Sequence, residues 1–518
     1  MNGRIRLCDV AVIVDPAADN VAVVKAPLRN GLRVVHGNGG MEVRDDLSMG
    51  DRMAIAEIPS GDYLIQFGLP FAKSTGIRKG EKVSSANTID ALPKGRPARN
   101  RSRLTVTRRD ACKQRRFMGY ERSDGRCGTR NIFVVVPTSM CASATAVHIA
   151  GAFEDGKSRR GVDGVVALAN TEGCGCAGGL QIERFLRVLK NTILHPNVGG
   201  ALIVDLGCEQ TNRAVMHDYL CRGVTAGRLG KPIDWLTIQR AGGARRAQEK
   251  GIRLVGARLG RLGEAARKPC PIGKLVVGAE CGASDAFSGI TANRVIGNAV
   301  DKVISGKGAA IFSELPEMVG AERILFPRMR DRAVLEKFKA GMRWYDRIAR
   351  RLNAPMDNNL VPENKAGGLL NPFIKSIGAV MKGGTAIIED FLDYGEAVGK
   401  KGLSIMQGPG NDLESVTGLA ASGATVICFS TGRGTVTGNA IVPVIKISST
   451  SALYRRMPED IDFDAGAVIG PERRRPTFDQ AGDALLAKIL SVASGEKTGS
   501  ETARQRQFQV WTAGKLSL

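Results

Sequence analysis

Short apolar runs recur through the first 90 residues, and turn residues separate them. Four such runs lie at 11–14, 21–24, 32–35 and 53–56, with glycine, proline, asparagine or aspartate between them. Runs of this length with such punctuation are typical of strands joined by tight turns. The first 90 residues are therefore predicted to form a small all-β module.

The pattern changes after residue 118, where apolar runs alternate with longer helix-like segments such as 181–190. Such alternation is typical of a parallel sheet with covering helices. The predicted fold class is therefore α/β, with Rossmann-like parallel-sheet domains after the β module. The runs that we interpret as strands are 132–136, 165–168, 201–204, 275–277, 385–388, 424–429 and 441–447.

These patterns divide the chain into five predicted segments. The β module covers residues 1–90, and the basic stretch 91–118 has no sustained periodicity, as expected of a linker. The first α/β domain is predicted at 119–360 and the second at 361–495. The polar end, 496–518, is predicted to be a flexible tail. A chain of 518 residues is long enough for about three domains.

The segment from Leu275 to Asn293 stands out as the organising element of the chain. An apolar run of the kind found in buried parallel strands is followed at once by small and polar residues. In open α/β sheets, ligands bind just beyond the carboxyl end of a strand, so a site is predicted here. The alternative is an ordinary glycine-rich connection with one buried cysteine. The polar residues that mark this candidate site are Cys281, Ser284, Asp285, Ser288, Thr291 and Asn293.

Glycine-flanked cysteines follow three of the predicted strands. The chain has eleven cysteines and no secretory signal, which favours free thiols or metal ligands over disulfides. Cys174, Cys208 and Cys281 would converge if their strands are parallel neighbours. Such a cluster could hold divalent iron, alone or as an iron–sulfur centre. The alternative is that these cysteines only fill small spaces in the core.

The charge of the chain is strongly positive, at +23, and is concentrated at 96–130 and 245–268. Nucleic-acid binding is one interpretation, but no helix-turn-helix, finger or aromatic-basic pattern accompanies the charge, which makes it the weaker one. A solvated surface that attracts a small anionic substrate is the more common case. No apolar run reaches the roughly 18 residues of a membrane span, so no membrane association and a cytoplasmic location are predicted. A homo-oligomer is left open.

Several long motifs resemble those of the altronate and galactarate dehydratase family. The resemblance covers most of residues 119–466, and residues 1–90 resemble the β-clip or SAF domain that precedes the catalytic part in this family. The matching phrases are GYERSDGRCGTRN (119–131), NTEGCGCA (170–177), LIVDLGCEQTN (202–212), ECGASDAFSGITAN (280–293), SELPEMVGAE (313–322), ENKAGGL (363–369) and ASGATVICFSTGRGTVTG (421–438).

The resemblance implies elimination of water from a hydroxylated sugar acid such as altronate or galactarate, assisted by a divalent metal, usually iron. Such chemistry needs a base for the proton alpha to the carboxylate, an acid for the leaving hydroxide, and positive charge for the intermediate. Asp285 and Glu209 are candidates for proton transfer, and Lys365 could be the base if burial lowers its pKa. The candidate substrate-binding residues are Arg126, Arg130, Asn131, Asn170, Ser284, Thr291, Asn293 and Arg433.

The chain departs from the family at positions where histidines are expected. A GHK-like turn is replaced by residues 50–52 (GDR), an HTHN-like ending by residues 84–87 (SSAN), and a further histidine by Asn170; Gln407 and Asn411 replace an expected Asp and Tyr. Imidazole is a common metal ligand and acid or base, so the chemistry is expected to differ. Three interpretations follow: a lyase with altered proton transfer, a carbon–sulfur lyase acting on a sulfonated hydroxy acid such as sulfolactate, and a non-catalytic family member that retains ligand binding.

Overall fold

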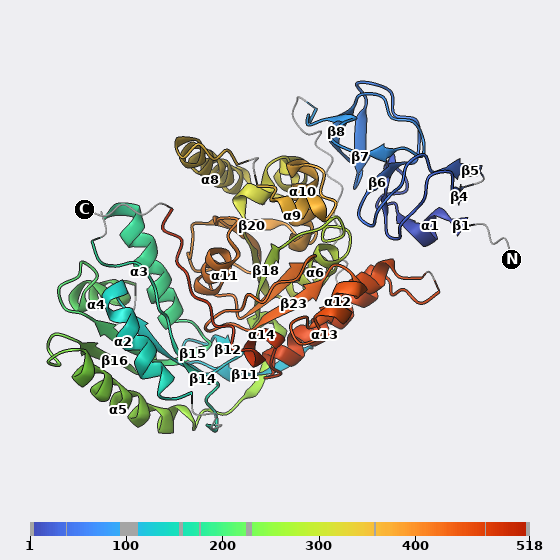
Figure 1. The fold of residues 1–518 in the computed structure, drawn as a ribbon. Helices are drawn as coiled ribbons and strands as arrows, with labels where there is room; N and C mark the ends of the chain where they lie inside the picture. Colours follow the sequence, from blue (N-terminus) through green and yellow to red (C-terminus); the bar gives the residue numbers. More distant parts are fainter. Residues whose placement is uncertain are drawn as a thin grey trace.

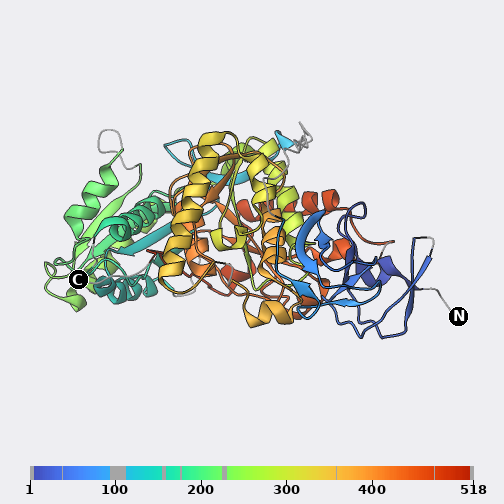
Figure 2. The same ribbon diagram turned by 90° about the horizontal axis from the view of Figure 1, so that it is seen from above.

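The computed structural model has three parts, and the seven-stranded part lies between the other two in both views (Figures 1 and 2). The prediction of an all-β module followed by parallel-sheet α/β domains is confirmed. The described residues are 5–37, 39–93, 112–154, 159–175, 178–223, 230–356, 359–471 and 473–513.

The N-terminal module consists of short strands in three small sheets, ordered β1-β4-β5, β2-β3-β6-β9 and β10-β8-β7. Alternate residues of its strands enter two small apolar clusters, which is why short runs suffice here. The elements are β1 Ile5–Arg6, α1 Leu7–Val10, β2 Ala11–Val12, β3 Val21–Val24, β4 Arg33–His36, β5 Gly39–Glu42, β6 Arg52–Ala54, β7 Tyr63–Gln66, β8 Leu69–Ser74, β9 Lys82–Val83 and β10 Thr88–Ile89.

The second part is a four-stranded parallel sheet with helices on both faces, in the order β14-β13-β15-β16. Side chains of α2 and α5 pack on one face, and side chains of α3 and α4 pack on the other. Its elements are β13 Ile132–Pro137, α2 Met140–Gly151, β14 Gly164–Ala167, α3 Gly179–Ile193, β15 Val198–Asp205, α4 Arg213–Cys221, β16 Ile233–Thr237 and α5 Ala244–Leu262.

The third part is a seven-stranded parallel sheet, ordered β20-β21-β19-β18-β22-β23-β24, with β18 as its middle strand. Helices α6 and α13 pack on one face, and α11 packs on the other together with α3 of the second part. Its strands are β18 Val276–Gly282, β19 Ala309–Phe312, β20 Ile388–Leu392, β21 Gly402–Met406, β22 Val426–Thr431, β23 Val444–Ser448 and β24 Phe463–Asp464.

The remaining elements connect or cover these sheets. A small antiparallel sheet, ordered β12-β11-β17, lies where the second and third parts meet along the chain. These elements are β11 Arg116–Glu121, β12 Cys127–Gly128, β17 Lys268–Pro271, η3 Ile272–Lys274, α6 Ala292–Ser305, η4 Leu315–Met318, α7 Glu322–Leu325, η5 Phe326–Arg328, α8 Arg332–Arg351, α9 Pro362–Ala366, α10 Pro372–Ala379, η6 Val380–Gly383, α11 Asp412–Ala421, α12 Ser451–Arg456, η7 Gly466–Ile469, α13 Phe478–Ala493 and α14 Gly499–Thr502.

Three predicted segment boundaries are corrected by the structure. The boundary at 360/361 falls inside the seven-stranded sheet, because β18 and β19 pair with strands that follow it. The linker 91–118 runs into strand β11, and its residues 94–111 lie outside the described part. The predicted tail 496–518 is packed as far as residue 513: Glu501 pairs with Arg130 at 2.6 Å, and Val510 and Trp511 join the core.

Among the described residues, no helix has both the length and the apolarity that a bilayer crossing requires.

Candidate functional site

Seven chemically active side chains meet at the carboxyl edge of the seven-stranded sheet, and we call them the buried charge cluster. The two neighbouring middle strands, β18 and β19, end here, as expected of a ligand site in an open parallel sheet. The cluster also draws on η4, α10, η6 and the first residue of α11. Its members are Glu280, Cys281, Glu314, Glu317, Lys375, Lys382 and Asp412.

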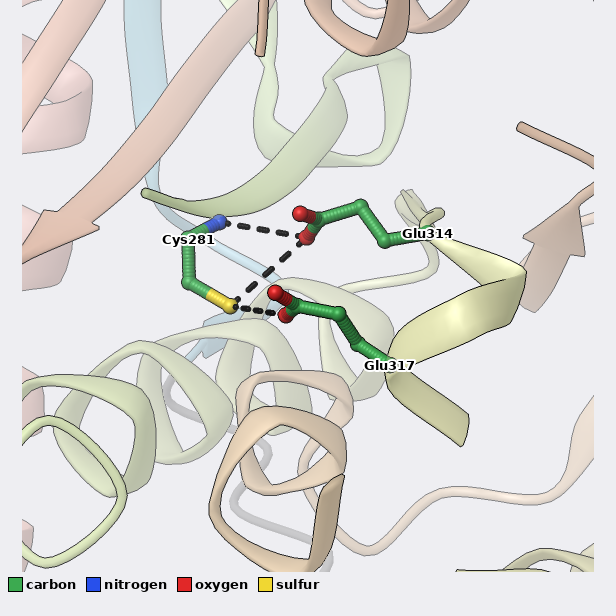
Figure 3. A group of neighbouring side chains, drawn as sticks. All are labelled: Cys281, Glu314 and Glu317. Atoms are coloured by element: carbon green, nitrogen blue, oxygen red, sulfur yellow. Dashed lines mark hydrogen bonds between the residues drawn. The ribbon is translucent and has the colours of Figure 1, made fainter. Parts of the chain in front are cut away.

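One half of the cluster is built around the Cys281 thiol (Figure 3). Its Sγ lies 3.1 Å from Glu317 Oε2 and 3.6 Å from Glu314 Oε2, and the three side chains point toward one another. Lys382 Nζ lies 2.9 Å from the sulfur and also bonds Glu314, while Lys375 Nζ pairs with Glu317 at 2.9 Å. All five side chains are almost fully buried, so the two ammonium groups balance the two carboxylates without help from water.

Burial and neighbouring charges fix the protonation states in this half. Burial raises the pKa of the Cys281 thiol well above its usual value, and Glu314 and Glu317 raise it further, so the sulfur is protonated at neutral pH. Burial opposes the charge of Lys382, but Cys281, Glu314 and Glu317 outweigh it and raise its pKa, so it stays cationic. Burial also opposes the charge of Glu317, but Lys375 and Lys382 outweigh it and lower its pKa. Glu317 is therefore a carboxylate held between two cations.

The other half consists of the carboxyl groups of Glu280, Glu314 and Asp412, whose oxygens lie within 4.8 Å of one another. Burial and the charge of Glu314 raise the pKa of Glu280 well above its usual value. Burial and Glu317 raise the pKa of Glu314 to about 7 and that of Asp412 to about 6. These raised pKa values mean that the three carboxyl groups hold a proton more readily than ordinary acids do.

The local backbone conformation places these three carboxyl groups close together. Glu314 has a φ of 77°, a left-handed conformation that is costly for a residue with a side chain. A Cβ on Gly282 would lie 2.4 Å from Asp412 Oδ2, so only glycine fits beside that carboxyl group. Asn411 caps helix α11 by accepting a hydrogen bond from Leu413 N and thereby fixes the helix start that carries Asp412.

A chamber of about 450 Å³ lies next to the cluster, and Glu317 and Lys375 contribute to its lining. Its walls include the rings of Trp344, Tyr345 and Trp511. Asn359 also lines it, and the Oδ1 of this residue is buried without a hydrogen-bond partner in the described part of the chain. A volume of this size with a few polar groups on apolar walls is typical of small-molecule sites.

A residue of the second part, Arg184, contacts the aromatic side chains that form one wall of this chamber. The Arg184 guanidinium lies 4.6 Å from the ring centroids of both Trp344 and Trp511, and it pairs with Asp393 at 2.7 Å. Trp511 stacks on Tyr345, with ring centroids 5.5 Å apart. The chamber therefore depends on contacts between residues that are far apart in sequence.

The predicted proton-transfer residues do not enter the cluster. Lys365 is exposed, so the burial that its role as a base requires is absent. Glu209 lies in the second part, where it accepts hydrogen bonds from Leu206 N, Gly207 N and the Thr138 hydroxyl. Asp285 accepts bonds from Ser288 and from the Ser449 hydroxyl, although it shares the lining of a small pocket with Lys375. Glu209 and Asp285 therefore brace loops.

The predicted substrate-binding residues of the second part hold backbone together. Arg130 pairs with Glu501 and donates to backbone carbonyls, and Asn131 donates to Gly161 O and Leu262 O. Arg126 is an exposed partner of Asp124. Asn170 donates to Pro137 O and accepts a hydrogen bond from Glu172 N.

The remaining predicted binding residues also have partners within the chain. Thr291 donates to Ser449 O and Asn293 donates to Gly378 O, while the carbonyl of Ser284 accepts a bond from Asn364. Arg433 is exposed and pairs with Glu363 at 2.7 Å. Ser284 and Asn293 nevertheless line the same small pocket as Asp285 and Lys375, at the junction with the N-terminal module.

The structure does not bring the three predicted metal-binding cysteines together. Cys281 is buried in the cluster, whereas Cys208 is exposed at the other sheet and Cys174 lies beside Cys141, whose thiol raises its pKa. Among the described residues, neither group with metal-ligand spacing contains Cys174 or Cys208. The donors around Cys281 are held by Lys375 and Lys382, so this set does not fit a thiolate-bound iron.

At the two positions of the N-terminal module where the family resemblance implies histidines, this chain has other polar residues that bond to each other or to neighbours. Asp51 pairs with Lys82 at 2.7 Å, and Asn87 accepts a hydrogen bond from Ser84 N. Among the described histidines, only His195 has a clearly shifted pKa. Burial and the charges of Arg126 and Lys231 lower this pKa, so the ring is neutral. The buried charge cluster therefore contains no imidazole.

Sequence reasoning found Cys281 and missed the other six members of the cluster. Glu280 lies beside Cys281, and Glu314 and Glu317 lie in the SELPEMVGAE phrase, but an acidic residue alone gives no sign that it is buried. Lys375 and Lys382 belong to no quoted motif. Asp412 follows the glycine–proline–glycine turn after β21, and this position beyond a strand was the one available signal.

Three family models together match most of the chain. The SAF domain of altronate/galactarate dehydratases matches residues 10–91. The second domain described as D-galactarate dehydratase/altronate hydrolase matches residues 119–263, and the D-galactarate/altronate dehydratase C-terminal domain matches residues 272–516. The last two matches meet between the two α/β parts seen in the structure.

Individual relatives match over most of their length. The altronate dehydratase of Escherichia coli (strain K12) is 32% identical over 504 residues, which is 96% of this chain and 98% of that protein. The galactarate dehydratase (L-threo-forming) of the same organism is 30% identical and covers 92% of each chain. The (2R)-sulfolactate sulfo-lyase subunit beta of Chromohalobacter salexigens is 31% identical over 76% of this chain and 97% of that protein.

Proposed function

The chain belongs to the D-galactarate/altronate dehydratase family, and from this premise we propose that it is a hydro-lyase that eliminates water from a small anionic sugar acid. The observation that carries the proposal is the chamber next to the buried charge cluster, with one carboxylate and one ammonium group in its lining. Because Glu317 and Lys375 lie side by side in this lining, one can remove a proton from a substrate whose carboxylate the other binds.

The residues that face the chamber have complementary roles. Glu317 is ionised and can accept the proton alpha to the substrate carboxylate. Lys375 remains cationic, because the charge of Glu317 outweighs its burial and raises its pKa, so it can bind the substrate carboxylate and stabilise the enolate that proton loss creates. The proton taken up by Glu317 then leaves with the hydroxide of the neighbouring carbon as water, which gives an enol that becomes a 2-keto-3-deoxy acid. The buried Asn359 Oδ1 can accept a hydrogen bond from a substrate hydroxyl.

Three deeper residues position this pair. Lys382 and Cys281 contact Glu317 from the protein side, and Glu314 anchors Lys382. Together with Lys375, Lys382 keeps the buried Glu317 ionised, so the effect of Lys382 on the reaction acts through Glu317. Iron held by thiolates has no part in these steps, since the Cys281 surroundings do not fit it.

A panel of sugar acids tests the proposal directly. The purified chain is incubated with altronate, galactarate and related hydroxy acids, and formation of a 2-keto-3-deoxy acid is followed. We expect turnover of at least one acid, and a loss of about 100-fold or more in Lys375→Met, because the substrate carboxylate loses its charged partner. Lys339→Met, at a partly exposed lysine on α8 outside the chamber, is the matched control. No turnover of any acid would leave the non-catalytic interpretation standing.

A second candidate function follows from the similarity to a sulfo-lyase subunit. Elimination of sulfite from a sulfonated hydroxy acid also begins with loss of a proton alpha to a carboxylate, so the same Glu317 and Lys375 would serve. Sulfolactate therefore belongs in the panel, with release of sulfite as the readout. Sulfite release without dehydration would move the assignment to a carbon–sulfur lyase.

We propose a cytoplasmic location for this activity. All ten described cysteines are free thiols, as is usual in a reducing compartment.

A further inference from the structure

A second cavity, of about 550 Å³, lies where the second and third parts of the chain meet, and cationic side chains predominate in its lining. The lining comes from residues 153–154 and 159–165 of the second part, from Tyr120 of β11, and from the segment 497–506. That segment includes α14, which packs against β23 of the third part. The five cations of the lining are Arg159, Arg160, Lys497, Arg504 and Arg506.

Two of the three acidic residues in this lining take their partners from outside it. Both carboxylate oxygens of Glu501 accept hydrogen bonds from the Arg130 guanidinium, at 2.6 and 2.7 Å. Asp163 accepts a hydrogen bond from the backbone amide of Asn131 at 2.6 Å, and Arg267 lies 3.7 Å from its other oxygen. Because Glu501 and Asp163 are paired in this way, they do not balance the five cations.

The third acidic residue, Glu154, is the one that pairs with cations of the lining. It pairs with Arg506 at 2.8 Å and lies 4.0 Å from Arg504. Across the described residues, Arg160 and Lys497 form no ion pair or side-chain hydrogen bond. Cations gathered in one cavity repel one another, and a bound anion would remove this repulsion. The charge of the cavity therefore calls for an anionic ligand.

We propose that this cavity binds a small anion that carries phosphate groups. Guanidinium groups bind phosphate through paired hydrogen bonds, and lysine adds a compact positive charge. The tetrahedral oxygens of a phosphate accept hydrogen bonds from several directions, which suits cations that come from two separate segments of the chain. A volume of about 550 Å³ is typical of small-molecule sites, so the ligand can be larger than a single phosphate.

This site is separate from the one proposed for the reaction. The cavity shares no lining residue with the chamber beside the buried charge cluster. Its lining draws on both α/β parts, and the Arg130–Glu501 pair crosses the same junction. An anion bound here would therefore hold the two parts together and stabilise the folded chain, since it binds a surface that unfolding destroys.

Calorimetric titration of the full-length chain with pyrophosphate, at constant ionic strength, tests this site without reference to activity. We expect saturable binding of one pyrophosphate per chain. Arg160→Gln and Lys497→Gln should each weaken binding at least about fivefold, because each removes a charged hydrogen-bond donor. Neither side chain has a partner to lose, so both variants should fold as the wild type does. Arg245→Gln, at a side chain on α5 that is 92% exposed, is the matched control and should bind normally.

Thermal unfolding gives a second readout of the same site. Pyrophosphate should raise the midpoint of the wild type and should leave that of the double variant Arg160→Gln/Lys497→Gln unchanged.

Four results would overturn the proposal. These are no saturable binding by the folded wild type, equal affinity in both cavity variants and the wild type, an equal loss in Arg245→Gln, and binding of citrate as tight as that of pyrophosphate. The third result would mean that pyrophosphate responds only to the overall positive charge, and the fourth that the cavity does not select phosphate over carboxylate. Because turnover is not measured, this site and the proposed dehydratase activity can fail separately.

Discussion

A glutamate lies next to a cysteine at the carboxyl edge of each parallel sheet, but the environments of the two glutamates are opposite. Glu209, beside Cys208 at the four-stranded sheet, accepts hydrogen bonds from two backbone amides and from hydroxyl groups. Burial opposes its charge, yet these backbone bonds outweigh it and lower its pKa. Glu280, beside Cys281 at the seven-stranded sheet, has one serine partner, and its burial and the neighbouring Glu314 raise its pKa.

This difference separates an acid that braces a loop from the acids at which we propose the reaction takes place. A carboxylate whose bonds are all made within the chain has nothing left for a ligand, whereas the acids at the seven-stranded sheet leave oxygens and charge unsatisfied. A glutamate next to a cysteine therefore stabilises a loop at one sheet and belongs to the buried charge cluster at the other.

Removal of the Lys382 charge should have the largest effect on stability. In Lys382→Met, Glu314 loses its cation inside the protein, and breaking a buried pair in this way costs about 3–5 kcal/mol. The free energy of unfolding, measured with urea, should fall by that amount. The double variant Lys382→Met/Glu314→Gln should recover part of the loss, because the unpaired charge is gone. A loss below about 1 kcal/mol in the single variant would show that the cluster does not depend on this pair.

Glu209→Gln should cost less and should leave catalysis intact. The neutral amide gives up charge-assisted bonds from Leu206 and Gly207, a loss of about 1–3 kcal/mol in the free energy of unfolding. Turnover per folded molecule should stay within about threefold of the wild type. A large fall in turnover with unchanged stability would instead support the role in proton transfer that the sequence predicts for Glu209.

The boundary between the two sheets should respond to pH through His195. This residue of the second part shares a hydrogen bond of 3.1 Å with Ala424 O of the third, and Asn197 N donates to its other ring nitrogen, so both nitrogens are used by the neutral ring. Its folded pKa lies well below the ordinary 6.5, so below pH 6.5 the unfolded chain binds the proton more readily. This contribution to stability is lost as pH falls, with a slope of at most about 1.4 kcal/mol per pH unit.

Urea unfolding between pH 5 and pH 8 measures that slope. His195→Gln should be less stable overall but should lose the part of the slope that belongs to the imidazole. Equal slopes in the wild type and the variant would show that His195 does not remain neutral in the folded chain.

Thiol labelling should separate the two cysteines with little effect on the protein. Cys208 is exposed and should react with iodoacetamide in the native state, whereas Cys281 is buried and its thiol is kept protonated. Mass spectrometry of the labelled peptides measures this. Rapid native labelling of Cys281 would mean that solvent reaches the thiol half of the cluster.

Much of the fold could be predicted from the sequence, because local periodicity reports strands and helices. The runs at 132–136, 165–168 and 201–204 became β13, β14 and β15, within a few residues. The run at 385–388 was placed too early, since β20 begins at Ile388. The domain boundary failed for a different reason: which strands share a sheet depends on long-range pairing, and no local pattern encodes that order.

The site was harder to predict than the fold. The segment after β18 was recognised because a strand that ends in glycine and polar residues is a local signal. The roles of Arg130 and Asn131 were not foreseeable, since their partners lie far away in the sequence, at Glu501 and Leu262. Glu317 lies in a motif that matches the family and Lys382 lies in none, but nothing in the sequence near either residue indicates that it is buried. Their importance comes from shared burial, which appears only when the chain is folded.

The most direct test of the account is the rate at which Glu317→Gln and Glu209→Gln turn over the best acid of the substrate panel. If the reaction takes place at the edge of the seven-stranded sheet, Glu317→Gln should lose at least about 100-fold in kcat, as expected for loss of a general base, while Glu209→Gln stays within about threefold. Near-normal kcat in Glu317→Gln, or a large loss confined to Glu209→Gln, would contradict the account.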